Sequence, residues 1–252
     1  SIHEALGAGV CLIAYGSGNS EKTRILLQHL GDLAAYMPID ISREHLIGAA
    51  KDIATDFPRL EVLPVCADFS KPIALPTPRN PVSRKVVFFP GSTIGNFHPE
   101  QATEFLRGIK DSIGADGGLL IGVDVPKSRA RLELAYDDPE GVTARFNLNM
   151  LEHINRTLGT DFDLGAFKHR AVWNEDASRV EMHLVSTRAQ GVRLGEHRFQ
   201  FQSGETIWTE SSYKYSLERF RAVAEAAGLV VDRVWQDPRQ LFSVQLLSPR
   251  AA

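Results

Sequence analysis

Cysteine is scarce in this sequence, with only Cys11 and Cys66 among 252 residues. Two cysteines cannot build a disulfide framework, and a multi-cysteine metal site has no further ligands to use. Because both lie in short apolar runs, we expect two buried free thiols. No H-E-x-x-H motif or metal-ligand spacing links the candidate histidines, His153, His169, His183 and His197. The sequence therefore predicts no metal site.

Long apolar runs and blocks of basic residues are missing as well. No run approaches the ~20 apolar residues that span a bilayer, and residues 1–10 lack the basic start and apolar stretch of a signal peptide. No Lys/Arg block exceeds two residues, and the formal net charge is −3, so a nucleic-acid partner is not expected. These absences favour a cytoplasmic protein with no membrane contact, and charge and composition favour a monomer.

Strand and helix patterns alternate along the first half of the chain, which favours a mostly parallel sheet covered by helices. A helix after residue 20 should bury Ile25, Leu26, Leu30 and Leu33. Ser42 is predicted as the N-cap of the next helix. Apolar strand patterns occur at residues 10–15, 36–41, 61–66, 85–89 and 119–125, and further helical patterns at residues 44–57 and 99–113.

The pattern changes after Pro126. A helix at residues 142–158 is followed by two-residue alternation at 179–186 and 196–201, which indicates an inserted α+β lobe. The chain then ends with a helix at 216–228 and strands at 229–236 and 242–247. We therefore predict a core of residues 1–125 and 210–252, with a lobe of residues 126–209.

A glycine-containing loop, Gly16-Ser17-Gly18, follows the first predicted strand and precedes a helix. Glycines let a backbone approach a ligand closely, and helix-start N–H groups can bind anionic groups. The dinucleotide fingerprint requires a third glycine where this chain has Glu21. A nicotinamide cofactor is therefore disfavoured.

Acidic and aromatic residues stand at the ends of the next two predicted strands. Asp40 lies where a carboxylate can accept both hydroxyls of a ribose. Asp68 and Phe69 could bind an adenine amine and pack on its ring, and the alternatives are a turn cap and a core aromatic residue. Because open α/β sheets bind ligands beyond the carboxyl ends of their strands, the three features together favour a nucleoside site.

Asn96 lies in a second loop, FPGSTIGNF, after the fourth predicted strand. Its amide can both donate to and accept from the backbone groups of an amino acid. A structural turn with Asn96 in a left-handed conformation is the alternative.

Several sequence motifs are similar to those of a known family: YGSGNSEKT, PIDIS, ADF, FPGSTIGNF, AYDDPEGVTARFNLNML, RVEMHLVS and GETIWTESSYKYSLERF. In this order they resemble the histidine-specific α-N-methyltransferases of ergothioneine biosynthesis, over nearly the whole chain. The resemblance implies an α/β, Rossmann-like seven-stranded methyltransferase sheet, closed by the C-terminal strand pair, with helices on both faces and the lobe as an inserted α+β substrate lobe. It also implies trimethylation of L-histidine to hercynine with S-adenosylmethionine.

The resemblance also assigns residues to the site. The cofactor side comprises Gly16, Ser17, Gly18, Lys22, Asp40, Asp68 and Phe69. Asn96 and Tyr136 are placed at the amino and carboxylate groups of the substrate. Met182, Glu210 and Ser212 are placed around its imidazole.

The chemistry requires a neutral amine, so a proton must leave before each transfer. Tyr136, or a water held near it, is the candidate for conducting that proton; the alternative is an aromatic helix end packed on the core. Glu210 can accept an imidazole N–H, with Ser212 on the same strand face. The alternative for Glu210 is an exposed ion pair with Lys214.

Members of the resembled family usually carry several dozen residues ahead of the first strand, including helices that cap the site, and here about ten precede it. We therefore expect these 252 residues to bind cofactor but to methylate histidine poorly. Two other functions stay open: a related methyltransferase for another amino acid or an indole, and a binding module that is inactive without the cap.

Overall fold

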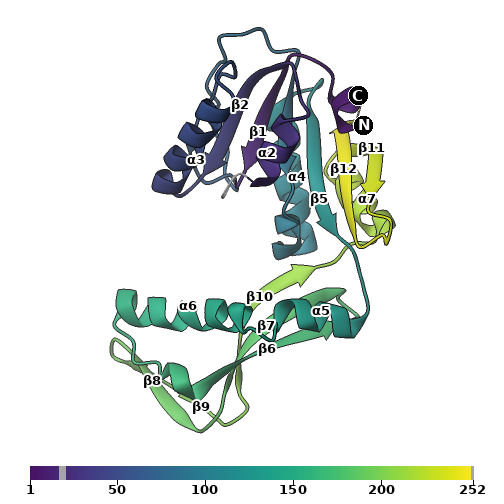
Figure 1. The fold of residues 1–252 in the computed structure, drawn as a ribbon. Coiled ribbons are helices and arrows are strands. Elements are labelled where there is room, and N and C mark those ends of the chain that lie inside the picture. Colours follow the sequence, from purple (N-terminus) through teal and green to yellow (C-terminus); the bar gives the residue numbers. More distant parts are fainter. Residues whose placement is uncertain (17–20, 251–252) are drawn as a thin grey trace. The chain divides into compact units, whose positions relative to one another are not determined.

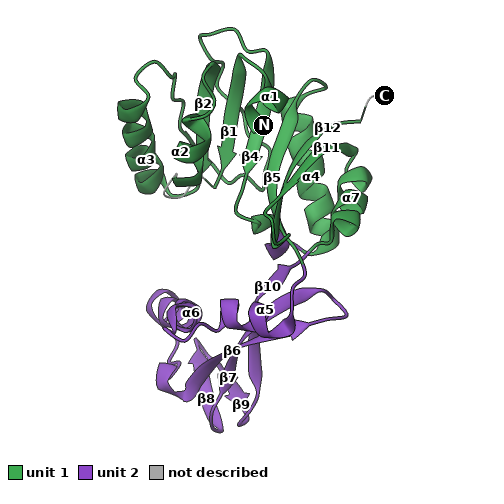
Figure 2. Cartoon of the chain, turned by 45° about the vertical axis from the view of Figure 1, so that its right-hand side comes forward, with its two compact units in different colours: residues 1–94, 98–125, 215–252 green, residues 95–97, 126–214 purple. Residues whose placement is uncertain are grey.

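The computed structural model describes residues 1–16 and 21–250, and the chain divides into two compact units (Figure 2). Unit 1 comprises Ser1–Ile94, His98–Val125 and Tyr215–Ala252, and unit 2 comprises Gly95–Phe97 and Pro126–Lys214. The predicted lobe ended at residue 209. Unit 2 continues to Lys214 because its last strand stays paired within the unit as far as Tyr213.

Unit 1 is built on a seven-stranded sheet with the order β11-β12-β5-β4-β1-β2-β3 (Figure 1). Strands β1 to β5 pair in parallel, and β12 runs antiparallel to both of its neighbours. The seven-stranded, Rossmann-like methyltransferase architecture expected from the sequence is confirmed. The strands are β1 (Val10–Tyr15), β2 (Leu33–Asp40), β3 (Val65–Cys66), β4 (Arg84–Phe89), β5 (Gly118–Asp124), β11 (Leu229–Gln236) and β12 (Phe242–Pro249).

Helices cover both faces of this sheet, with α2 and α3 on one face and α4 and α7 on the other (Figure 1). The inward side of α4 carries Ala102, Phe105, Leu106, Ile109 and Ile113, which recur at helical spacing and are all buried. The helices of unit 1 are α1 (Ile2–Leu6), α2 (Glu21–Leu27), α3 (Arg43–Asp56), α4 (Pro99–Ile113) and α7 (Leu217–Ala226). Ser42 is the N-cap of α3, as predicted.

Two sequence expectations for this sheet are wrong. The inward face of α2 is set by Leu26 and Leu27, so Ile25 points outward and is 57% exposed, while Leu33 begins β2. The third strand is only two residues long and is an edge strand, which pairs with β2 alone among the described strands. Cys66 is therefore exposed. Only Cys11 is the buried thiol expected for both cysteines.

Unit 2 contains a three-stranded antiparallel sheet, β10-β7-β6, with α5 and α6 packed on one face. In β7 every second residue from Val180 to Ser186 is buried, as the two-residue alternation predicts. The elements are α5 (Arg129–Tyr136), α6 (Val142–Leu158), the 3₁₀ helix η2 (Leu164–Ala166), β6 (Phe167–Asn174), β7 (Arg179–Ser186), β8 (Gln190–Leu194), β9 (His197–Phe201) and β10 (Thr206–Tyr213). Strands β8 and β9 form a separate hairpin. Across the described ranges of both units, no helix is long and apolar enough to cross a membrane.

Candidate active site

The carboxyl ends of β1, β2 and β3 bring together three of the predicted cofactor residues. Gly16 follows β1 and donates its N–H to the carbonyl of Ile39 at 3.0 Å, and Ala67 donates to the carbonyl of Asp40 at 3.1 Å. The Phe69 ring lies over Gly16, 3.5 Å from where a Cβ would stand. Gly16 also has φ +63°, which favours glycine. Backbone, carboxylate and aromatic ring therefore meet at one edge of the sheet.

The Asp40 carboxylate can accept further hydrogen bonds at this edge of the sheet. Its Oδ1 accepts the N–H of Ser42 at 2.9 Å, which fixes the side chain at the end of β2. Within the described residues no other hydrogen bond or ion pair reaches the carboxylate, which is half-buried. A carboxylate has about four lone-pair positions, so Asp40 can accept further donors such as ribose hydroxyls.

Asp68 is held in the turn after β3. Its carboxylate accepts the N–H of Ser70 at 3.0 Å and the hydroxyl of Ser70 at 2.6 Å, and it pairs with Lys71 at 3.0 Å. The Ser70 hydroxyl, followed by Lys71, lowers the pKa of Asp68 to about 2. The group is therefore an anionic acceptor at any physiological pH, and its lone pairs allow an adenine amine as a further donor.

Four aromatic rings line the same edge. Phe69 stacks on Tyr15 with ring centroids 5.6 Å apart, and it meets Phe89 at 5.8 Å and Phe105 at 6.1 Å. Offset and edge-to-face contacts of this kind stabilise a cluster of rings. Tyr15, Phe89 and Phe105 are buried, so the partly exposed Phe69 next to Gly16 is the ring on which a flat base could pack.

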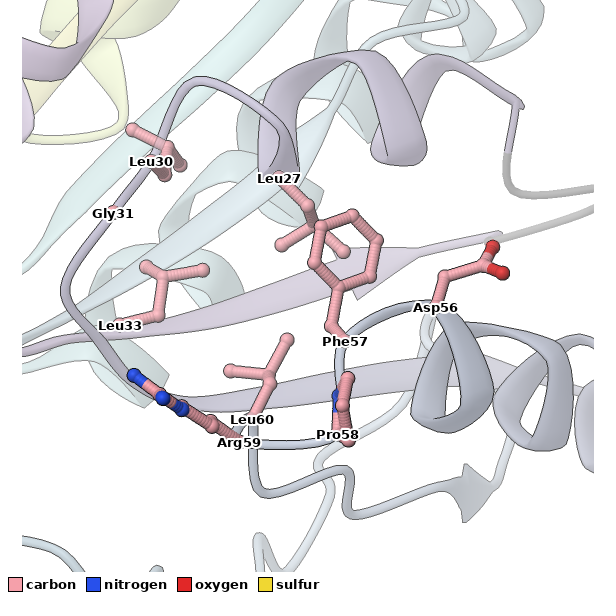
Figure 3. Close-up of a pocket in the computed structure, with 9 residues that line it drawn as sticks. All are labelled: Leu27, Leu30, Gly31, Leu33, Asp56, Phe57, Pro58, Arg59 and Leu60. Carbon is pink, nitrogen blue, oxygen red and sulfur yellow. The ribbon is translucent and has the colours of Figure 1, made fainter.

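Lys22 belongs to α2 of unit 1. It is exposed on the first turn of α2 and lines a groove of about 870 Å³ together with Ile25, Phe88 and Leu120. The other two predicted cofactor residues, Ser17 and Gly18, lie outside the described residues. A second hollow, of about 320 Å³, is lined by residues from the amino end of β2 and the ends of α2 and α3 (Figure 3). It is at the opposite end of β2 from Asp40, so it is not part of this site.

In unit 2, a β-bulge decides which way the predicted substrate residues face. Trp208 pairs with His183 and Glu210 pairs with the adjacent Met182, so Thr209 is the extra residue in β10. The bulge places Glu210 on the Met182 side of the sheet, together with Ser212 two residues later. That side is the one covered by α5 and α6.

Tyr136, at the end of α5, meets Ser212 and Lys214 in a closed triangle of polar atoms. The Tyr136 hydroxyl lies 2.8 Å from the Ser212 hydroxyl, and Lys214 Nζ donates to the first at 2.7 Å and to the second at 2.9 Å. Ser212 and Lys214 are buried and Tyr136 is partly buried. The alternative of an exposed ion pair between Glu210 and Lys214 is wrong, because Lys214 is buried. Its spacing of two from Ser212 in an extended strand was the signal that could have identified it.

The Glu210 carboxylate is half-buried, and no hydrogen bond or ion pair reaches it within the part of the chain that is described. Burial raises the pKa of Glu210, and the positive charge of Lys214 opposes that rise. A partly desolvated carboxylate without a partner is an acceptor that a ligand N–H can satisfy.

The raised pKa of Glu210 makes a prediction for stability. An acid whose pKa is higher in the folded protein loses stability as pH rises from its unfolded pKa, near 4.5, through its folded pKa. We therefore expect Glu210→Gln to raise the melting temperature at pH 7 and to lose this advantage below about pH 4. Thermal melts of both proteins across this range test it; an advantage that is the same at every pH would mean that the charge is not its cause.

His169 and Asn147 fix the end of α5 that carries Tyr136, a role that no motif in the sequence predicts. The Asn147 amide donates to His169 Nδ1 at 2.9 Å, so His169 Nε2 carries the proton that it donates to the Tyr136 carbonyl at 2.7 Å. Both side chains lie on the helix-covered side of the sheet. The phenol of Tyr136 is thereby anchored through its own backbone.

Asn96 ends the 3₁₀ helix η1 (Thr93–Asn96) and is exposed. The preceding Gly95 is buried, and a Cβ there would lie 2.6 Å from the carbonyl oxygen of Tyr213 and 3.5 Å from Ser212 Oγ. Only glycine permits this approach. It brings Asn96 to the region of Ser212 and Tyr136.

Comparison with known proteins agrees with this architecture. Residues 1–249 match the family model described as "Histidine-specific methyltransferase, SAM-dependent". The chain is 41% identical over 241 residues to a histidine N-alpha-methyltransferase of Mycolicibacterium smegmatis, covering 93% of this chain and 74% of that protein. It is 32% identical over 235 residues to ergothioneine biosynthesis protein 1 of Neurospora crassa, covering 90% of this chain and 26% of that protein.

A solved structure shows the same fold. A methyltransferase from Clostridium acetobutylicum that depends on S-adenosylmethionine superposes with a TM-score of 0.56 at 11% identity, covering 99% of this chain and 87% of that one. The family match extends over nearly all of the chain, and its cofactor is S-adenosylmethionine. This chain therefore belongs to the histidine-specific, S-adenosylmethionine-dependent methyltransferase family.

Proposed function

We propose that this enzyme transfers three methyl groups in succession to the α-amino nitrogen of L-histidine, which gives hercynine, a step of ergothioneine biosynthesis. The observation that carries the choice of histidine is the half-buried Glu210 carboxylate, which has no partner among the described residues and lies on one strand face with Ser212. An imidazole ring can donate to the first and accept from the second.

The remaining substrate groups are assigned to neighbouring residues. Asn96 and Tyr136 bind the amino and carboxylate groups, and Met182, which is paired with Glu210, packs against the imidazole. On unit 1, Asp40 accepts the ribose hydroxyls, Asp68 accepts the adenine amine and Phe69 packs on the base. Gly16, Ser17, Gly18 and Lys22 complete the proposed cofactor contacts.

The protein's part in the chemistry is to position the amine and to remove its protons. S-adenosylmethionine supplies an electrophilic methyl group, and the transfer is an in-line displacement governed by orientation. The amine must lose a proton before each transfer, and the Tyr136 hydroxyl is the proposed route for it. The product is a quaternary ammonium that donates no hydrogen bond, which suits aromatic and small polar neighbours better than a paired carboxylate.

Mass spectrometry tests the proposal directly. The protein is incubated with methyl-deuterated S-adenosylmethionine and an equimolar mixture of histidine, tryptophan and phenylalanine. We expect these 252 residues to label histidine slowly, with up to three methyl groups, and to label the other two amino acids far less. Labelling of tryptophan or phenylalanine instead would favour the related amino-acid or indole methyltransferase. If S-adenosylmethionine binds but nothing is labelled, these residues form a binding module and the proposal is wrong.

The cellular setting is part of the proposal. The substrate is a small molecule, and the proposed location is the cytoplasm. We infer a monomer from the charge and composition of the chain. Sedimentation at assay concentration tests the monomer, and cell fractionation tests the location.

A further inference from the structure

Lys214 is fully buried and donates hydrogen bonds to two hydroxyl groups of unit 2. Only 1% of its surface is exposed, and its Nζ lies 4.7 Å from the centre of the Tyr136 ring while it donates to Tyr136 and Ser212. Burying a charge is costly, and the two hydroxyls and the ring face contribute to offsetting that cost. The buried lysine also determines how the two hydroxyls that it contacts are hydrogen-bonded.

An ammonium group can only donate, so it fixes how both hydroxyls use their protons. The oxygens of Tyr136 and Ser212 each accept from Lys214, and one hydroxyl proton bridges the two at 2.8 Å. The phenol is the more acidic group and hence the better donor, so Tyr136 donates to Ser212. The proton of Ser212 is then the one left over, and it can only be donated outward.

Glu210 lies on the same strand face, two residues before Ser212. Two residues of an extended strand span about 7 Å. An imidazole ring with one hydrogen bond at each nitrogen fits such a span. The face therefore offers an acceptor at Glu210 and a donor at Ser212, which match the N–H and the lone pair of a neutral imidazole.

We propose that Lys214 is a positioning residue that sets this donor and acceptor order, so that the pocket binds the neutral imidazole of histidine and rejects the imidazolium. The inference rests on the proposed function. The imidazolium has two N–H donors, and its second N–H would meet the Ser212 proton. Lys214 also repels the added positive charge.

Other titratable groups near Glu210 and Ser212 also affect whether an imidazolium binds there. Glu210 on β10 attracts an imidazolium, Tyr136 comes from α5, and His169 on β6 is bonded to the Tyr136 carbonyl. The facing residues of β7, Val180 and Met182, are apolar. Without Lys214, the Glu210 carboxylate would favour the imidazolium and the two hydroxyls could turn to accept from it.

Titration calorimetry of histidine with S-adenosylhomocysteine present, from pH 5.5 to 8, tests whether Lys214 sets the donor at Ser212 and the acceptor at Glu210. In the wild type we expect affinity to fall about tenfold toward pH 5.5, because the imidazole pKa is near 6.5. Lys214→Met should bind histidine with a fall of less than about threefold over that range. Lys214→Arg keeps a donating cation and should retain the wild-type slope. Glu210 and His169 are present in all three proteins, so a difference in slope reports on Lys214.

A second measurement uses the wild type alone, so it does not depend on whether the Lys214 variants fold. The ¹⁵N shifts of labelled histidine bound to the wild type at pH 6 should show one protonated and one unprotonated ring nitrogen; two protonated nitrogens would overturn the inference. Equal pH slopes for wild type and Lys214→Met would also overturn it, and histidine methylation by the wild type would then leave the proposed function standing. If the wild type neither binds nor methylates histidine, the proposed function itself fails.

Discussion

Glu210→Ala is expected to lower kcat/KM for histidine by roughly ten- to a hundred-fold. The variant removes a charge-assisted hydrogen bond to the imidazole, which contributes about 1.5–3 kcal/mol when the pair is partly buried. Phenylalanine cannot donate to Glu210, so it should lose nothing and should gain where the desolvation cost of the carboxylate disappears. The change is therefore one of specificity.

The experiment compares kcat/KM for histidine and phenylalanine in four proteins. Glu210→Gln keeps the size and an acceptor oxygen but not the charge, and it should fall between the wild type and Glu210→Ala for histidine. Glu196→Ala removes an exposed carboxylate from the β8–β9 turn of the same unit and serves as the charge-matched control. Equal losses for both substrates in Glu210→Ala would mean that Glu210 supports the fold or the transfer geometry. The choice of histidine would then lose the observation that carries it.

Asp40→Ala is expected to weaken S-adenosylmethionine binding by roughly a hundred-fold or more while the protein stays folded. Two ribose hydroxyls that donate to a carboxylate contribute about 1.5–3 kcal/mol each. The free oxygen of Asp40 at the end of β2 is the observation behind this expectation. Calorimetric titration with the cofactor measures the loss.

Two further variants separate the ribose contact from the local structure. Asp40→Asn keeps an acceptor for the Ser42 N–H and should preserve the turn, yet it loses the charge and should still bind poorly. Glu44→Ala removes an exposed carboxylate from the first turn of α3 and should bind like the wild type. Unchanged affinity in Asp40→Ala would remove Asp40 from the cofactor site.

Much of the fold could be predicted from the sequence, because hydrophobic periodicity is local. The predicted helices at residues 99–113 and 142–158 and the strands at 179–186 and 229–236 coincide with α4, α6, β7 and β11. Periods of 3.6 and 2 reveal which face of a segment is apolar. They failed for Ile25, which lies on the outward face of α2, and for Cys66, which lies on the edge strand β3.

The substrate half of the site was decided by tertiary structure. Spacing alone put Glu210 and Ser212 on one face, but only the bulge at Thr209 determines that this face is the one with Met182 rather than the one with Trp208. A bulge shifts every later side chain to the other face, and its position depends on the pairing with β7. Likewise, Lys214 resembles a surface charge in the sequence. The helix that carries Tyr136 covers it and converts it into a buried donor, and a residue 78 positions away makes that contact.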